Sequence, residues 1–260
     1  QAHSYVRGNW RHSEDTTPMI LAKCCHDLDL LQYYAKSMCK SVSSVGDLTY
    51  FTAKNAPGGA AKRCLDCKYQ DSCPYSAKTI YIENWKNRGC PENDWPYNIL
   101  TLKLPLTEKA LTEAVKNGPY GRCVFACDND VVDHQQVSMT FENGVKATLT
   151  MTAFTAGGGR IMRFFGTLGE VVLDEARDVI EVKPFGKPAE EIKIGTLTES
   201  GYGHGGGDSG LVRELYEILC GNASPATALE ASVESHLMGI CAEKSRLEGG
   251  RLVSVHGEKE

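Results

Sequence analysis

The sequence predicts an α+β fold in which one large, mostly antiparallel, open β-sheet carries its helices on one face. Two observations lead to this class. Short strand patterns follow one another through residues 122–194, whereas helical patterns are grouped before and after that run, and this segregation is typical of α+β domains. No internal repeat or low-complexity segment divides the chain. Residues 1–260 are therefore expected to form a single domain.

The first part of the chain alternates single strands with helices. Residues 2–8 read as a strand, and a helix is expected to begin with Thr16 or Thr17 as N-cap and Pro18 in its first turn. This helix should end near Lys36. Three further elements are expected: a strand at 41–51, a short helix at 76–85 and a helix at 107–118 that ends on Gly118.

The second part reads as an antiparallel meander. Residues 134–154 alternate in polarity on both sides of "ENG", which predicts a hairpin. Further strands are expected at 123–126, 160–166, 169–174, 178–183 and 190–194, followed by helices at 207–220 and 226–247 and a last strand, "RLVSVHG".

Composition narrows the class of partner. A net charge of -5 without any basic run argues against nucleic acid and anionic membranes, and favours a small-molecule substrate. No apolar run approaches the roughly 20 residues that span a bilayer. Eleven cysteines, an odd number, indicate free thiols and a cytoplasmic location. Because "AHSYVRGNW" reads as a strand already under way, we expect a fragment of a longer protein.

The stretch "KCCHDLDLL" carries the strongest chemical pattern. Lys23, His26 and Asp29 share one narrow face of the helix expected over 16–36. A solvent-facing stripe is one interpretation. The rest of the helix is so apolar that burial nearly all round is expected, and the charged face would then line a cavity or a partner domain. A histidine beside a carboxylate and a lysine suits removal of a proton from a hydroxyl. Zinc is disfavoured here because Cys24 and Cys25 point away from His26.

Several stretches together resemble the Gfo/Idh/MocA oxidoreductases, the group that includes glucose–fructose oxidoreductase and inositol dehydrogenase. The stretches are "PMILAKCCHDLDLL", "HSYVRGNWR", "DVVDHQQVSMTFENGVKATLTMTAF", "FFGTLGEVVLD" and "GHGGGD". The resemblance implies an N-terminal Rossmann domain that binds NAD or NADP and a C-terminal α+β domain that oligomerises through its open sheet. This chain resembles the second domain alone, since no strand followed by G-x-G-x-x-G and a helix occurs in it.

The resemblance also implies roles for residues. The family's acid/base histidine maps onto His26, and the lysine of some members maps onto Lys23. An aspartate often found four residues before the histidine is Ala22 here, which leaves Lys23 and Asp29 as candidates to replace it. The implied substrate is a sugar, sugar acid or cyclitol, and the implied assembly is a homodimer or larger.

Substrate contacts are expected from three further segments. Arg7, Asn9, Trp10 and Arg11 suit a polyhydroxylated ring, with surface packing as the alternative. His204 and Asp208 resemble a sugar-binding turn, with helix capping by Asp208 as the alternative. In "CDNDVVDHQ", an Asx turn accounts for the polar residues other than His134. The substrate-binding candidates are Arg7, Asn9, Trp10, Arg11, Asp29, His134, His204 and Asp208.

The loop "CLDCKYQDSC" offers a possible structural zinc site. Cys64, Cys67 and Cys73 have C-x2-C-x5-C spacing, and Cys90 is a candidate fourth ligand. Only one C-x2-C pair is present, so free thiols or a disulfide remain alternatives.

The sequence thus predicts half of an NAD(P)-dependent sugar or cyclitol dehydrogenase, inactive by itself. Two alternatives stay open. One is a relative that uses NAD transiently to cleave glycosidic bonds, and the other is a non-catalytic domain for sugar binding or assembly.

Overall fold

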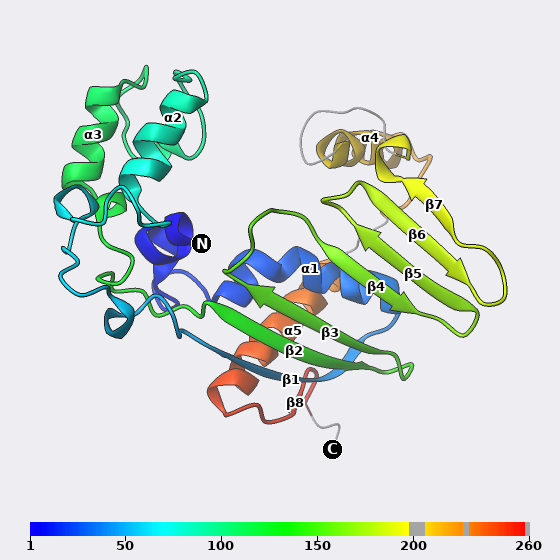
Figure 1. Cartoon of the computed structure of the whole chain (residues 1–260). Coiled ribbons are helices and arrows are strands. Elements are labelled where there is room, and N and C mark those ends of the chain that lie inside the picture. The colour runs from blue at the N-terminus through cyan, green and yellow to red at the C-terminus, as the bar shows by residue number, and fades with distance from the viewer. Residues whose placement is uncertain (198–205, 226–228, 258–260) are drawn as a thin grey trace. The chain divides into compact units, whose positions relative to one another are not determined.

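The computed structural model describes residues 1–197, 206–225 and 229–257, and it confirms the α+β class. The strands of these residues form two four-stranded antiparallel sheets, so the expectation of one continuous sheet is wrong (Figure 1). The chain divides accordingly into two compact units. The first comprises Gln1–Ala153 with Leu229–Glu260, and the second comprises Phe154–Ala228.

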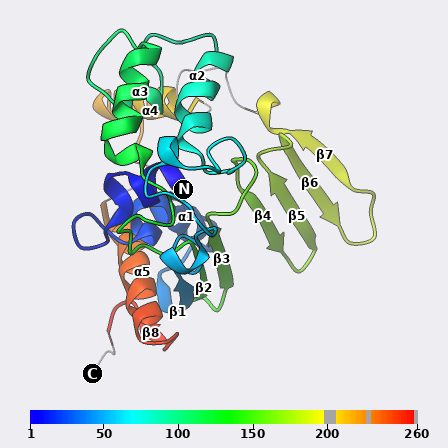
Figure 2. The same ribbon diagram turned by 60° about the vertical axis from the view of Figure 1, so that its left-hand side comes forward.

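The sheet of the first unit has the strand order β3-β2-β1-β8. Its strands are β1 (Cys39–Asp47), β2 (His134–Phe141), β3 (Lys146–Thr152) and β8 (Val253–Ser254). Helices α1 (Met19–Ala35) and α5 (Leu229–Leu247) lie together on one face of this sheet (Figures 1 and 2). Along β2, Val137 and Met139 are buried with the helices, whereas Gln136 and Ser138 are exposed. The period of two expected for a half-buried strand is therefore present.

The hairpin predicted for residues 134–154 is confirmed. Strands β2 and β3 pair antiparallel from His134 with Thr152 to Thr140 with Lys146. Gly144 in the turn has a φ of 89°, a conformation that glycine adopts without steric cost.

The contact between α1 and α5 depends on a glycine. A Cβ atom built on Gly239 would lie 2.4 Å from Leu21 Cδ2 and 3.2 Å from Leu28 Cδ1, both on α1. The absence of a side chain therefore sets how closely the two helices approach.

We expect Gly239→Ala to lower the free energy of unfolding by about 1 kcal/mol, because overpacking outweighs the gain in helix propensity. Urea denaturation followed by circular dichroism measures the change. Gly210→Ala is the matched control, since no atom lies within 4 Å of its Cβ position and only the propensity gain remains. Equal stabilisation by both changes would contradict a tight contact at Gly239.

Smaller helical segments complete the first unit. Two of them are α-helices, α2 (Asn84–Asn87) and α3 (Glu108–Asn117), and the hydroxyl of Thr107, the N-cap of α3, accepts from Ala110 N at 3.2 Å. The remaining helical turns are η1 (Ala2–Arg7), η2 (Asn9–Arg11), η3 (Ala53–Asn55), η4 (Cys64–Asp66), η5 (Thr79–Glu83), η6 (Tyr97–Ile99) and η7 (Pro119–Gly121).

Two predicted strands in this unit are wrong. Residues 2–8 form the helical segment η1 instead, which buries Ala2, Tyr5 and Val6, a spacing of three and four residues that suits a helix. Residues 123–126 form no strand, and Val124 and Phe125 are buried in a loop. In both cases a short apolar run was assigned the wrong backbone conformation.

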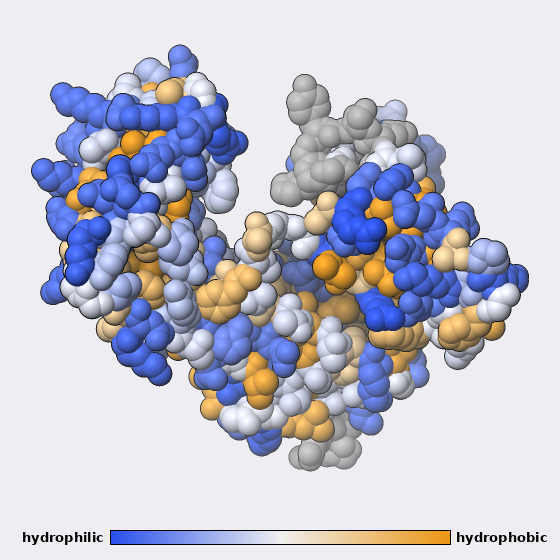
Figure 3. All heavy atoms as spheres, in the orientation of Figure 1, coloured by the Kyte–Doolittle hydropathy of each residue, from blue (hydrophilic) through white to orange (hydrophobic). Residues whose placement is uncertain are grey.

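The second unit is the predicted meander. Its sheet has the order β4 (Ile161–Phe165), β5 (Gly169–Asp174), β6 (Val179–Pro184) and β7 (Glu190–Lys193), followed by η8 (Ile194–Thr196) and α4 (Gly207–Leu219). Apolar side chains such as Phe165, which is 77% exposed, remain accessible on this unit, and Figure 3 shows apolar patches over its sheet. Among the described helices, none has the length and apolar character needed to cross a membrane.

Candidate active site

The face of α1 that bears Lys23 and His26 is exposed. Cys24 and Leu28 are buried on the opposite side with the sheet and α5, so the expectation that this helix is buried nearly all round is wrong. Asp29 is half-buried. In the described chain, His26 makes no hydrogen bond or ion pair, so its imidazole is available to an incoming ligand.

Lys23 and His26 occupy positions i and i+3 of α1, so their side chains are neighbours on the helix surface. An imidazole exchanges protons near neutral pH, and an ammonium group binds ligand oxygens. The thiol of Cys24 does not join them, because burial, followed by the nearby Asp27 carboxylate, raises its pKa to about 12. The exposed face therefore presents an imidazole and an ammonium group, and the Cys24 thiol is not part of it.

A second polar cluster joins the segment after η1 to the segment before β2. Arg11 Nε donates to Asp128 Oδ1 at 2.9 Å, and Arg122 Nη1 donates to the same atom at 2.6 Å. His12 Nε2 lies 3.2 Å from Asp128 Oδ2. The hydrogen bond from Arg11, and after it those from Arg122 and His12, hold the pKa of Asp128 well below its usual range. Arg11, expected to bind substrate, is thus already engaged by a carboxylate that sequence reasoning had assigned to a turn.

The lowered pKa of Asp128 implies a pH-dependent contribution to stability. The contribution is fully present above the ordinary value of 3.8 and is lost as pH falls from there through the folded-state pKa. Since the Asp128 side chain is 53% exposed, we expect Asp128→Asn to cost about 1 kcal/mol or less at pH 7. The difference from the native chain should shrink between pH 4 and 2.

Urea titrations followed by tryptophan fluorescence measure this difference, because Trp10, Trp85 and Trp95 all belong to the first unit. Asp71→Asn is a control that removes an exposed ion pair with Lys78 elsewhere in this unit. A gap that stayed constant down to pH 2 would rule out the ion-pair explanation.

Asp133 and His134 form a third group at the start of β2. The Asp133 side chain is fully buried, and Oδ2 accepts from Thr49 N at 2.9 Å and from Tyr50 N at 2.6 Å. Its Oδ1 lies 3.2 Å from Thr49 Oγ1 and 2.8 Å from Nδ1 of His134. The buried carboxylate fixes the orientation of a half-exposed imidazole. Because Gln135 is buried with the helices, His134 belongs to the opposite, open face of the sheet.

The other predicted substrate residues are scattered. Arg7 is fully buried, and it donates from Nε to Arg122 O and from Nη2 to Tyr75 O, each at 2.7 Å. Asn9 and Trp10 are exposed. Asp208 lies in the first turn of α4, in the second unit, and Gly206 takes the N-cap position. His204 lies outside the described residues. No hydrogen bond or ion pair found in the described ranges joins any of these residues to His26.

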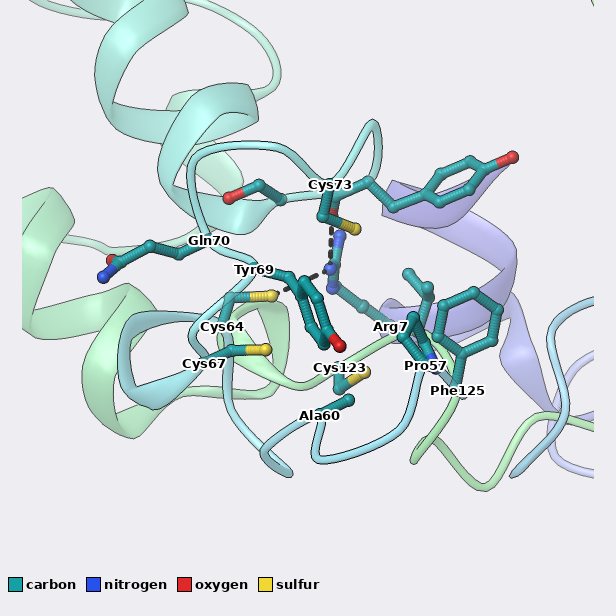
Figure 4. Close-up of a pocket in the computed structure, with 13 residues that line it drawn as sticks. Arg7, Pro57, Ala60, Cys64, Cys67, Tyr69, Gln70, Cys73, Cys123 and Phe125 are labelled. Atoms are coloured by element: carbon teal, nitrogen blue, oxygen red, sulfur yellow. Dashed lines mark hydrogen bonds between the residues drawn. The ribbon is translucent and has the colours of Figure 1, made fainter. Parts of the chain in front are cut away.

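The zinc hypothesis is not supported. Cys64, Cys67 and Cys73 do line one pocket, but its fourth cysteine is Cys123 (Figure 4). Cys90 is exposed and is not among the residues that line the pocket. Across the described residues, no three histidine, cysteine or acidic side chains are arranged to hold a metal ion. Cys123 was missed because nothing in its local sequence connects it to a loop some 50 residues earlier.

Comparison with known proteins gives a match in structure and not in sequence. No family model and no curated protein matches the chain. Levoglucosan dehydrogenase in complex with NADH and L-sorbose has a TM-score of 0.58 at 13% identity, over 98% of this chain and 54% of that one. An oxidoreductase domain protein from Kribbella flavida has a TM-score of 0.56 at 13% identity, over 95% and 53%. An NAD binding oxidoreductase from Klebsiella pneumoniae has a TM-score of 0.50 at 14% identity, over 89% and 48%.

The chain has the fold of about half of each of these oxidoreductases. The structural neighbours are of the Gfo/Idh/MocA type, so the resemblance predicted from the sequence is confirmed for the fold. The chain spans about half the length of each neighbour.

Proposed function

We propose that this chain is the substrate-side domain of an NAD(P)-dependent oxidoreductase that acts on a hydroxyl group of a sugar, sugar acid or cyclitol. The shared fold supports the proposal, since the neighbour with a TM-score of 0.58 is a dehydrogenase solved with NADH and a sugar. The observation that carries it is the exposed Lys23 and His26 pair on α1, the helix that opens the first sheet's helical layer.

The described residues do not fit a dinucleotide by themselves. Every strand pair in them is antiparallel, whereas a doubly wound nucleotide-binding sheet is built from parallel strands. We therefore assign the cofactor to a separate Rossmann domain of the intact protein.

His26 is the proposed acid/base. An imidazole whose ring has no partner in the described structure can accept the hydroxyl proton of a bound substrate. Lys23, one turn earlier, would hold the substrate oxygen and favour the alkoxide that develops as the proton leaves. Asp29, half-buried three residues after His26, is a candidate substrate contact on the same side of the helix.

Calorimetric titration with NAD and NADP tests whether the cofactor binds outside this chain. We expect no heat of binding from this chain and micromolar binding from the intact protein. Micromolar binding by this chain alone would refute the proposal that the cofactor site lies elsewhere. Product analysis with the intact protein separates a dehydrogenase, which forms NADH, from a glycosidase, which releases sugar without net redox change.

A further inference from the structure

A buried arginine lies among four cysteines in the first unit. Arg7 is 0% exposed, and its Nη2 donates to Cys64 Sγ at 3.3 Å. No carboxylate of the described chain forms an ion pair with it; Nε and Nη2 donate to the carbonyl oxygens of Arg122 and Tyr75 and to the Cys64 sulfur, and the guanidinium also interacts with the Tyr81 hydroxyl. Cys64 is the one cysteine of the cluster whose sulfur accepts a hydrogen bond from this guanidinium among the described residues, and it also lies 3.7 Å from the Arg122 carbonyl oxygen.

The backbone places a second cysteine next to Cys64. Cys64 and Cys67 bound the turn η4, and Cys67 N donates to Cys64 O at 3.2 Å. Residues i and i+3 of such a turn are close enough for a disulfide, as in other C-x-x-C motifs. Figure 4 shows both sulfur atoms pointing in the same direction, with the hydrogen bond from Arg7 reaching Cys64 Sγ. Both cysteines are free thiols in the structure.

The pocket also offers unused hydrogen-bond donors. Arg7 Nη1 and Ser76 Oγ are buried and have no partner within the described chain, and both residues line the pocket. The cavity has a volume of about 30 Å³, enough for a molecule of one or two heavy atoms. Oxygen atoms are the natural acceptors for these two donors.

We propose that Cys64 and Cys67 form a peroxide-reactive dithiol site, with Arg7 as a positioning residue. The Cys64 sulfur attacks one peroxide oxygen, an S–O bond forms as the O–O bond breaks, and the departing hydroxide takes the proton that the Cys64 thiol gives up and becomes water. The Cys67 sulfur then attacks Cys64 Sγ. An S–S bond forms as the S–O bond breaks, and the departing hydroxide takes the Cys67 thiol proton and leaves as a second water, so two sulfurs supply the two electrons that reduce the peroxide.

Peptide mapping tests the proposal directly. Trypsin cuts after Arg63 and Lys68, so Cys64 and Cys67 fall in one peptide, CLDCK, separate from Cys73 and Cys123. After hydrogen peroxide and then iodoacetamide, we expect CLDCK without alkylation and about 2 Da lighter than its reduced form. Cys64→Ser should abolish this species, and Cys90→Ser, an exposed cysteine outside the pocket, should leave it unchanged.

Two further variants examine the order of steps. Cys67→Ser removes the second sulfur, so the oxidised Cys64 should be trapped by dimedone as an adduct on that residue alone. Arg7→Lys should slow the reaction about tenfold, and circular dichroism verifies that this variant folds.

Three results would overturn the proposal. The first is full alkylation of both cysteines after peroxide, and the second is oxidation that links Cys73 or Cys123 instead. The third is one equivalent of zinc per purified chain that Cys64→Ser removes, which would assign these thiols to a metal. None of these results bears on His26 or on the proposed dehydrogenase.

Discussion

Replacing His26 with alanine in the intact protein is expected to lower kcat by about 10²- to 10⁴-fold, the range for loss of a general acid/base. The substrate's KM should change much less, because the imidazole acts mainly as the proton leaves. Since the His26 side chain is exposed and has no hydrogen-bond partner in the described structure, the melting temperature should stay within about 2 °C of the native value. Steady-state kinetics and a thermal shift assay measure both.

His236→Ala is the matched control for that experiment. His236 is also an exposed histidine on a helix of the first unit, and its ring lies 2.7 Å from the Ser232 carbonyl oxygen. This variant should keep its full turnover. If His26→Ala also kept full turnover while folding normally, His26 would have no part in the reaction, and a non-catalytic role for the domain would gain support.

Replacing Asp133 with alanine is expected to have the largest effect on stability, about 2–4 kcal/mol. The carboxylate is fully buried and accepts from Thr49 N, Tyr50 N and the Thr49 hydroxyl, so its removal leaves several donors without an acceptor. The segment after β1 should then separate from the start of β2. Urea denaturation monitored by tryptophan fluorescence measures the loss, with hydrogen exchange of Thr49 and Tyr50 as a local probe.

His134→Ala measures what the imidazole contact contributes to stability, apart from the backbone hydrogen bonds that the Asp133 carboxylate accepts. The His134 side chain is 42% exposed and makes one contact of 2.8 Å with Asp133, so we expect a cost of about 1 kcal/mol or less. A loss equal to that of Asp133→Ala would show that the imidazole contact, rather than the backbone donors, stabilises this region.

Local patterns predicted local structure well. The alternation on both sides of "ENG" located β2 and β3, because a strand with one buried face must repeat every two residues. Pro18 and the apolar spacing that follows it located α1, although Pro18 itself, and not Thr16 or Thr17, is the N-cap. The grouping of Lys23 and His26 on one face of α1 was also evident from helical spacing alone, but the exposure of that face was not.

Long-range pairing could not be predicted in the same way. Arg11 and Asp128 are 117 residues apart, and nothing near either residue specifies the other as its partner. The same holds for Cys123 in the cysteine pocket and for the division of the strands into two sheets. Each of these features depends on how distant segments pack against one another. That packing is determined by many core residues together and by no local sequence pattern.

The first unit is discontinuous, and this has a consequence for folding during synthesis. Helix α5 and strand β8 complete its core, yet they follow the whole of the second unit in the chain. The meander of Phe154–Ala228 is contiguous and rich in contacts between neighbouring strands, a topology that closes quickly. On the ribosome, the later-made unit should therefore reach its native state first. Until Leu229–Leu247 has been synthesised, residues Gln1–Ala153 cannot complete their core, and α1 and the helix-facing side of β1–β3 stay uncovered. We therefore expect Gln1–Ala153 to be the segment that most needs chaperone protection.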